Sequence, residues 1–104
     1  MVRLTEIKKM LESSGIPTAY LEFKEGHAPP LPFICWRETR INPFAADGAM
    51  YFHTSHVRVE LYEKHRNEKT EKALETVLSP FFYTKEEIPI ESEKCLMIVY
   101  EMEV

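Results

Sequence analysis

The sequence predicts an α+β domain in which a mainly antiparallel sheet carries two helices packed on one face. Two segments place apolar residues at the spacing of a helix, and several others alternate apolar and polar residues as strands do. The order is helix, strands, helix, strands, with hairpin-like connections, which favours antiparallel pairing. The 104 residues have the usual length of one domain, and no linker or low-complexity tract divides them. We therefore expect a single α+β domain over residues 1–104.

The beginning of the chain predicts a helix followed by a strand. The apolar residues that recur at helical spacing are Leu4, Ile7, Met10 and Leu11. Thr5 is the expected N-cap of this helix, and Gly15 with the following Pro17 is its stop. Residues 18–23 then alternate between two faces, which predicts a strand.

The middle of the chain predicts two strands separated by a long loop. Residues 33–37 form a nearly continuous apolar run, and residues 57–62 alternate, with a bulge expected near Thr54 and Ser55. Between them lies Asn-Pro-Phe-Ala-Ala-Asp-Gly at 42–48, which contains several turn-forming residues. Loops longer than about 12 residues are uncommon in compact domains and are usually functional or disordered. We therefore expect this loop to be presented to a partner.

The last part of the chain predicts a second helix and three strands. Asn67 is the expected N-cap of a helix over residues 68–78, which ends before Pro80. Residues 81–83 and 88–90 predict two short strands around an acidic turn, and Pro89 places the second at a sheet edge. The strictest alternation, over residues 94–102, predicts the final strand.

The charge distribution argues against nucleic acid as a direct partner. The formal net charge is −4, and residues 1–60 hold 7 basic and 7 acidic side chains, whereas residues 61–104 hold 6 basic and 10 acidic ones. An acidic domain without a basic stripe lacks the charge that phosphate-backbone binding requires. With no signal peptide and no apolar stretch of membrane-spanning length, we expect no membrane association and a reducing cytosol. Cys35 and Cys95 are then expected to be core thiols, although a disulfide across paired strands stays open.

No catalytic or metal-binding constellation stands out, and we expect neither an enzyme nor a cofactor. His53 and His56 are three residues apart, which in a strand directs them to opposite faces. The glutamates near the C-terminus alternate with lysines and predict a solvated surface rather than an acid–base pair. Gly48 follows Asp47 alone, so no phosphate-cradling loop is expected.

The aromatic and arginine residues around the predicted loop are the candidate contact residues. Large aromatic side chains usually belong to a core, but aromatic anchors and arginines are also enriched at protein interfaces. The six candidates are Trp36, Arg37, Arg40, Phe44, Asp47 and Tyr51.

Several motifs also resemble a known family. They are Pro-Pro-x-Pro-Phe-Ile-x-Trp at 29–36, Asn-Pro-Phe-Ala-Ala-Asp-Gly at 42–48, Val-Glu-Leu-Tyr at 59–62, Ile-Glu-Ser-Glu-Lys at 90–94 and Val-Tyr-Glu at 99–101. Together they resemble small prophage proteins of Gram-positive bacteria, which are similar to the tail terminator, or tail completion, proteins of long-tailed phages. The resemblance covers nearly the whole chain.

The resemblance implies a structural role in virion assembly. Such proteins form a homo-oligomeric ring, commonly a hexamer, that caps the tail-tube protein and offers a head–tail joining surface to the head connector protein. The implied location is the host cytoplasm during assembly and then the virion tail, and no catalytic residue is implied. Two alternatives stay open: a small ligand- or protein-binding module, such as a regulatory partner, using the loop as a lid, and a hydrolase using Cys35 with His53 or His56.

Overall fold

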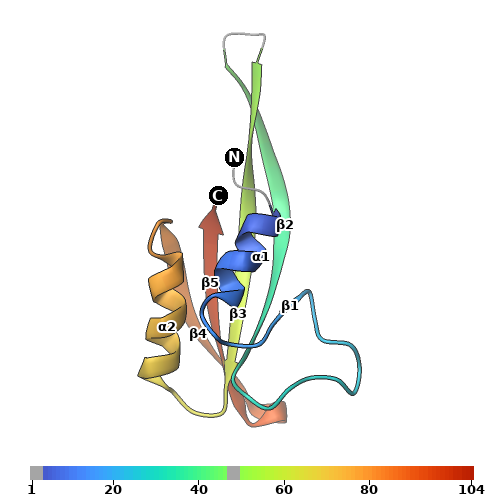
Figure 1. The fold of residues 1–104 in the computed structure, drawn as a ribbon, viewed down its shortest axis with the longest axis vertical. Helices are drawn as coiled ribbons and strands as arrows, with labels where there is room; N and C mark the ends of the chain where they lie inside the picture. Colours follow the sequence, from blue (N-terminus) through green and yellow to red (C-terminus); the bar gives the residue numbers. More distant parts are fainter. Residues whose placement is uncertain (1–3, 47–49) are drawn as a thin grey trace.

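The computed structural model describes residues 4–46 and 50–104, and for residues 42–46 and 50–54 it describes the backbone alone. The helices are α1 (Leu4–Glu12) and α2 (Glu68–Leu78), and a short 3-10 helix, η1, spans Glu91–Glu93. The strands are β1 (Thr18–Tyr20), β2 (Phe33–Ala46), β3 (Met50–Glu63), β4 (Tyr83–Ile90) and β5 (Cys95–Glu103). Figure 1 shows these elements in chain order.

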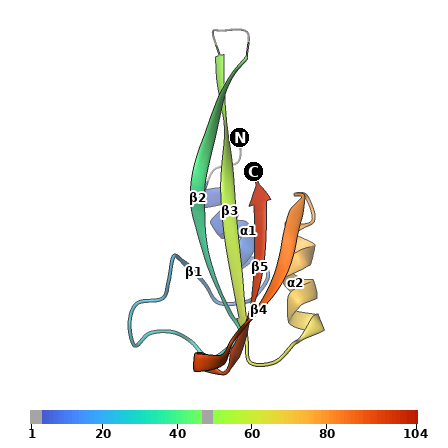
Figure 2. The same cartoon turned by 180° about the vertical axis from the view of Figure 1, so that it is seen from behind.

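The strands form one sheet in the order β1-β2-β3-β5-β4. The β2–β3, β3–β5 and β5–β4 pairs are antiparallel, and only β1 runs parallel to its neighbour β2. Both helices lie on the same face of this sheet, in front of it in Figure 1 and behind it in Figure 2. The predicted α+β fold, with two helices on one face of a mainly antiparallel sheet, is confirmed.

The core lies between this face of the sheet and the two helices. Its centre consists of the alternating residues of β3, namely Val57, Val59 and Leu61, which are fully buried. The helices contribute the fully buried residues Ile7 and Leu11 from α1 and Leu74 and Leu78 from α2. Burial of each such aliphatic side chain stabilises the fold by about 1.5–3 kcal/mol. The apolar residues that recur at strand and helix spacing in the sequence are therefore the ones that form this core layer.

The predicted cap of the second helix is confirmed, whereas that of the first helix is wrong. Asn67 precedes α2 in an extended conformation, and its side chain accepts a hydrogen bond from the Thr70 N–H at 3.2 Å. Helix α1 is already helical at Leu4, so Thr5 lies inside its first turn. The predicted strand at 18–23 is also shorter, because Leu21 has φ 69°, a left-handed conformation that ends β1 at Tyr20.

The predicted long loop between two strands is wrong. Strand β2 continues to Ala46 and β3 begins at Met50, and the two are paired residue by residue from Ala46↔Met50 through Pro43↔His53. A proline is tolerated here because, within the described residues, β2 has no neighbouring strand on its outer side beyond Trp36. The bulge lies between Glu38 and Arg40 on β2 rather than near Thr54 and Ser55 on β3.

The two short strands predicted around an acidic turn are a single strand, β4. Its eight residues pair with β5 from Tyr83↔Met102 to Ile90↔Cys95, straight through the acidic run. Charged residues are compatible with a strand at this position because β4 is the last strand of the sheet, where side chains reach solvent. The prediction that Pro89 belongs to an edge strand is confirmed.

Candidate functional site

The most distinctive feature of the molecule is a two-stranded arm, which we define as residues 42–46 and 50–54. Strand β5 pairs with β3 only from His56 onward, with a further backbone hydrogen-bond pair between Ser55 and Val104. Strand β1 reaches only to Trp36. Among the described residues, the two halves of the arm therefore pair only with each other, and Figure 1 shows them extending beyond the sheet. The molecule is accordingly elongated, with a longest extent of 50 Å against 28 and 25 Å.

The second feature is the sheet face without helices, which Figure 2 presents to the viewer. Arg58 lies at its centre and forms ion pairs with Glu60 at 2.8 Å and with Glu101 at 3.5 Å. Tyr62 donates a hydrogen bond to Glu60 at 3.1 Å, and burial together with Glu60 raises the pKa of Tyr62. His56 is 3.7 Å from Glu101. The charged side chains in the middle of this face are thus paired with one another.

The two sides of the same face are not neutralised. Arg37 and Arg40, on β2, are exposed and form no ion pair with any described residue. On the far side of the sheet, Glu86 of β4 is exposed. Glu91 and Glu93 of η1 are exposed in the β4–β5 turn at the end of the sheet; within the described chain, these three glutamates lie in no ion pair either. The unpaired arginines of β2 and the unpaired Glu86 of β4 therefore lie on opposite sides of the sheet.

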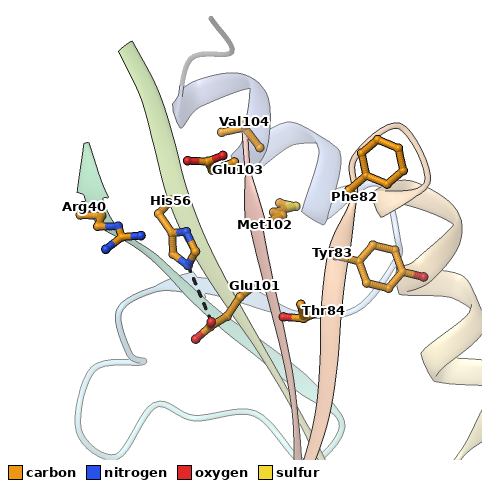
Figure 3. Close-up of a pocket in the computed structure, with 9 residues that line it drawn as sticks. All are labelled: Arg40, His56, Phe82, Tyr83, Thr84, Glu101, Met102, Glu103 and Val104. Carbon is orange, nitrogen blue, oxygen red and sulfur yellow. Dashed lines mark ion pairs between the residues drawn. The ribbon is translucent and has the colours of Figure 1, made fainter. Parts of the chain in front are cut away.

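A shallow hollow of about 750 Å³ lies beside the base of the arm (Figure 3). It is lined by Arg40, His56, Phe82, Tyr83, Thr84, Glu101, Met102, Glu103 and Val104. Phe82 is completely exposed, which is unusual for an aromatic side chain of this size. The hollow combines apolar surface with charged residues, as the rim of a protein contact does.

A polar network around the buried Glu71 joins α2 to the sheet on the helix-bearing side. Glu71 of α2 accepts two hydrogen bonds from Arg66, at 3.0 and 3.1 Å. It also forms an ion pair with Lys85 of β4 at 2.9 Å. Lys85 also contacts Glu75 at 2.7 Å, and Tyr100 donates to the same Glu75 oxygen at 2.7 Å. Burial alone raises the pKa of Glu71, but the hydrogen bonds from Lys85 and Arg66 outweigh it and lower that pKa. Glu71 is therefore held as a carboxylate.

Glu63, at the end of β3, is the neutral partner of this network. It is 1% exposed, and its Oε2 accepts a hydrogen bond from the Asn67 N–H at 2.9 Å. Burial and the neighbouring Glu71 raise the pKa of Glu63 to about 7. A hydrogen bond between the Glu63 and Glu71 carboxyl groups also raises this pKa, and because Oε2 accepts from Asn67, we assign the proton to Oε1. Below about pH 7, Glu63 and Glu71 thus carry one negative charge between them at the start of α2.

The candidate contact residue Trp36 does not lie on the surface, so this prediction is wrong. Its side chain is 4% exposed and belongs to the core between the sheet and the helices. Tyr20 packs edge-on against it at 4.8 Å between ring centroids. The apolar run at 33–37 is therefore a strand whose Trp36 faces inward.

Four of the other five candidates lie at the arm or at its base. Arg37 and Arg40 are exposed on the helix-free face, where a partner can reach them. Phe44 and Tyr51 belong to the paired backbone of the arm, and Asp47 lies outside the described residues. The structure thus brings the two arginines to the base of the arm that contains the two aromatic residues.

The residues of the hydrolase alternative are not brought together. Cys35 pairs across the hairpin with Glu60, whereas His56 is four residues further along β3, about 13 Å at strand spacing. His53 is further still along the same strand. Burial of the Cys35 thiol raises its pKa, which disfavours the nucleophilic thiolate. Both Cys35 and Cys95 are free, with β3 between their strands, so the disulfide left open is not formed.

Two features were missed from the sequence, although each leaves a signal there. Glu63 continues the alternation of Val57, Val59 and Leu61, so its buried position follows from strand periodicity. Glu71 precedes the buried Leu74 by three residues and so shares its helix face. The exposure of Phe82 has no such signal.

Searches for ion and membrane sites find no candidate in the described ranges. In residues 4–46 and 50–104, no group of three or more His, Cys, Asp or Glu side chains is arranged to hold a metal ion. Neither helix in these ranges has the length and apolarity needed to cross a membrane.

The fold and surfaces define the protein as a small α+β domain with a projecting β-arm and uncovered sheet edges. No protein-family model matches the chain, and the search of curated proteins gives no match.

Proposed function

We propose that the protein is a tail terminator of a long-tailed phage or prophage, which caps the tail tube as an oligomeric ring and forms the head–tail joining surface. The observation that carries this proposal is the arm, whose backbone pairs within itself and, among described residues, with no other part of the sheet. The family resemblance across nearly the whole sequence supports a ring as the kind of assembly. A hexamer is the ring size that the resemblance implies.

The physical argument concerns the stability of the arm. An isolated two-stranded hairpin is marginally stable in water, and it becomes independently stable only when it packs against further structure. Among the residues whose side chains are described, the core lies between the helices and the part of the sheet that β5 and β1 extend, with Val57 and Trp36 among its members. A second protein surface is therefore the natural support for it, and its sequence supplies the aromatic residues Phe44 and Tyr51 for such a contact.

The mechanism is stepwise. An acidic monomer or weak oligomer docks on the last ring of the tail-tube protein, and this template fixes the geometry in which the subunits close into a ring. The head connector protein then binds the completed ring. Arg37, Arg40, Phe44, Asp47 and Tyr51 are the proposed contact residues, and Trp36 is no longer among them because it is buried.

The arm is tested by replacing residues 42–54 with the two-residue turn Asn-Gly. This turn joins Ile41 to Ser55, which are partners across the hairpin. The shortened chain is expected to keep its circular dichroism spectrum and cooperative thermal unfolding. It is also expected to lose ring formation and binding to the tail-tube protein of the same phage, measured by light scattering.

A milder variant tests the contribution of the arm's side chains separately from that of its length. Phe44→Ser combined with Tyr51→Ser keeps the hairpin and removes two aromatic anchors, so it is expected to weaken the same assembly. A shortened chain that still forms rings on the tail tube as the full chain does would contradict the proposal.

The alternative of a protein-binding module has one observation in its favour, the hollow in which Phe82 is fully exposed. Such a module needs no ring, so the oligomeric state separates the two functions. Under this alternative, Phe82→Ser abolishes partner binding while the protein stays monomeric with and without the tail-tube protein.

A further inference from the structure

We infer that two copies of the free chain pair their arms edge to edge about a two-fold axis, so that the two β3 strands become neighbours in a four-stranded sheet. The paired edge is the edge of residues 50–54 on the side where β5 lies, which we call the open edge. The inference goes beyond the proposed ring, because it concerns the free chain before that chain meets the tail-tube protein. It assigns a structure to the weak oligomer of the proposed mechanism.

The first step is the direction of the backbone groups of β3. Ser55 donates its N–H to the carbonyl of Val104, directly after β5, and accepts the Val104 N–H, at 3.0 and 2.9 Å. Backbone groups alternate in direction along an antiparallel strand, so those of His53 and Tyr51 point to the same side as those of Ser55. Among the described residues, the pairing of β3 on this side goes no further than Ser55. The open edge therefore presents two N–H donors and two carbonyl acceptors.

The second step is that the other described free edges are protected against pairing. Pro43 lies opposite His53 across the hairpin. Because the backbone groups of His53 point away from β2, the nitrogen of Pro43 points outward, and it has no proton to donate. At the far edge of the sheet, β4 has a run of charged residues at 85–87, which natural edge strands use against association. The arm contains no Lys, Arg, Asp or Glu, so its open edge lacks this protection.

The third step is that the open edge is complementary to itself. Two residues that form a hydrogen-bonded pair in an antiparallel ladder exchange both of their N–H to carbonyl bonds. A two-fold axis beside Phe52 places Tyr51 of each copy opposite His53 of the other copy. This register pairs both donors and both acceptors of each open edge. It also brings no like charges together, because the arm has no charged residue of either sign.

The fourth step is the space beside the arm. In this register the partner's β3 continues the line of β5, and the partner's β2 continues the line of β4, because neighbouring strands alternate in direction. Figure 1 shows β5 and β4 stopping well short of the far end of the arm. The hollow of about 750 Å³, which includes the fully exposed Phe82, lies at this corner and receives the end of the partner's arm. The four paired strands give each hairpin the support that two strands alone lack.

A cysteine beside the axis tests the register. Phe52 faces Phe52 of the second copy as a non-hydrogen-bonded pair, with about 4.5 Å between the Cα atoms, which is within the range of a disulfide. Phe52→Cys is made together with Cys95→Ser, which removes a partly exposed thiol. Under mild oxidation this variant is expected to form a disulfide-linked dimer on a non-reducing gel.

The matched control places the cysteine on the other strand of the same arm. Phe44 lies across the hairpin from Phe52, so the two copies of residue 44 are three strand spacings apart, about 14 Å. This distance exceeds the reach of a disulfide. Phe44→Cys, also combined with Cys95→Ser, is therefore expected to stay uncrosslinked under the same conditions.

A proline on the open edge tests the hydrogen bonds. His53→Pro removes a donor that faces the second copy, and it leaves the ladder within the hairpin intact, as Pro43 does on the opposite strand. Each pair of copies then loses two hydrogen bonds, so the dissociation constant of the dimer is expected to rise about tenfold or more. Light scattering over a range of concentrations, without the tail-tube protein, measures it. His53→Ala keeps the N–H and is expected to associate as the unmodified chain does, and thermal unfolding shows that both variants are folded.

The outcomes judge the pairing separately from the proposed function. Equal cross-linking of the Phe52→Cys and Phe44→Cys variants overturns the pairing, and so does equal association of the His53→Pro and His53→Ala variants. An unmodified chain that is monomeric alone but forms rings on the tail tube also overturns the pairing, while the terminator function stands. A chain that cross-links through Phe52→Cys but forms no ring on the tube keeps the pairing and overturns the function.

One further outcome identifies a different occupant of the open edge. If Phe52→Cys forms no disulfide between copies while His53→Pro weakens binding to the tail-tube protein, the open edge receives a strand of that protein instead. The pairing between copies is then wrong.

Discussion

Replacing Glu63 by glutamine should remove a large part of the pH dependence of the protein's stability. The carboxyl group of Glu63 is buried at the junction of β3 and α2, accepts a hydrogen bond from Asn67 and lies against the carboxylate of Glu71. Its Oε1 is the oxygen to which we assign the proton, because Oε2 accepts from Asn67. A glutamine has nearly the same shape as the neutral acid and can donate to Glu71 from its amide while its oxygen accepts from Asn67.

The magnitude follows from the difference between the folded and unfolded pKa values of Glu63. Burial and Glu71 raise the pKa from 4.5 to about 7 in the folded protein. One pKa unit corresponds to about 1.4 kcal/mol, so the full shift corresponds to about 3 kcal/mol. The folded protein holds the proton more tightly, and this contribution to stability is present below pH 4.5 and is lost as the pH rises through about 7.

The assay is urea unfolding of both proteins across this pH range. The Glu63→Gln variant lacks the titrating group, so its free energy of unfolding minus that of the unmodified protein should increase by about 3 kcal/mol between pH 4.5 and pH 8. Other titrating groups are common to both proteins and largely cancel in the difference. A difference that stays constant with pH would show that Glu63 does not hold a proton in the folded protein, and would refute the reasoning.

The remaining predictions concern the same end of α2. Glu71→Gln should lower the free energy of unfolding at neutral pH by about 1–3 kcal/mol, because Arg66 and Lys85 lose a charged acceptor. Because the pKa of Glu71 is lowered in the folded protein, this loss should shrink in acid, and urea unfolding at both pH values checks it. Asn67→Ala should cost about 1 kcal/mol by removing the N-cap bond to Thr70, whereas Asn67→Asp should keep most of that stability in thermal unfolding.

Much of the fold could be predicted because local patterns and burial agree. The alternation of Val57, Val59 and Leu61 corresponds to a fully buried strand face, and Asn67 caps α2 as its position before the helix indicates. The arm could not be predicted in the same way. Pro43 lies in a segment of turn-forming residues, and its strand conformation depends on pairing with His53 across the hairpin, which is a non-local contact.

The candidate site was predictable only in part, for a similar reason. Arg37 and Arg40 can be chosen from the sequence as interface residues. That they lie on the opposite side of the sheet from Glu86 depends on the strand order. Trp36 has the composition of an interface anchor and is buried instead, because alternation in β2 places it with Ile34 on the helix-bearing face. A residue's type thus indicates its chemistry, whereas the register of its strand decides which surface it reaches.

The central claim is that this chain works as an assembled ring on a tail tube. The most direct measurement is its solution mass by light scattering over a range of concentrations, alone and with the tail-tube protein of the same phage. We predict an assembly of several copies of the 12.2 kDa chain, either alone or on the tube, with six copies as the number that the sequence resemblance implies. A protein that keeps the mass of one chain under both conditions would contradict the claim.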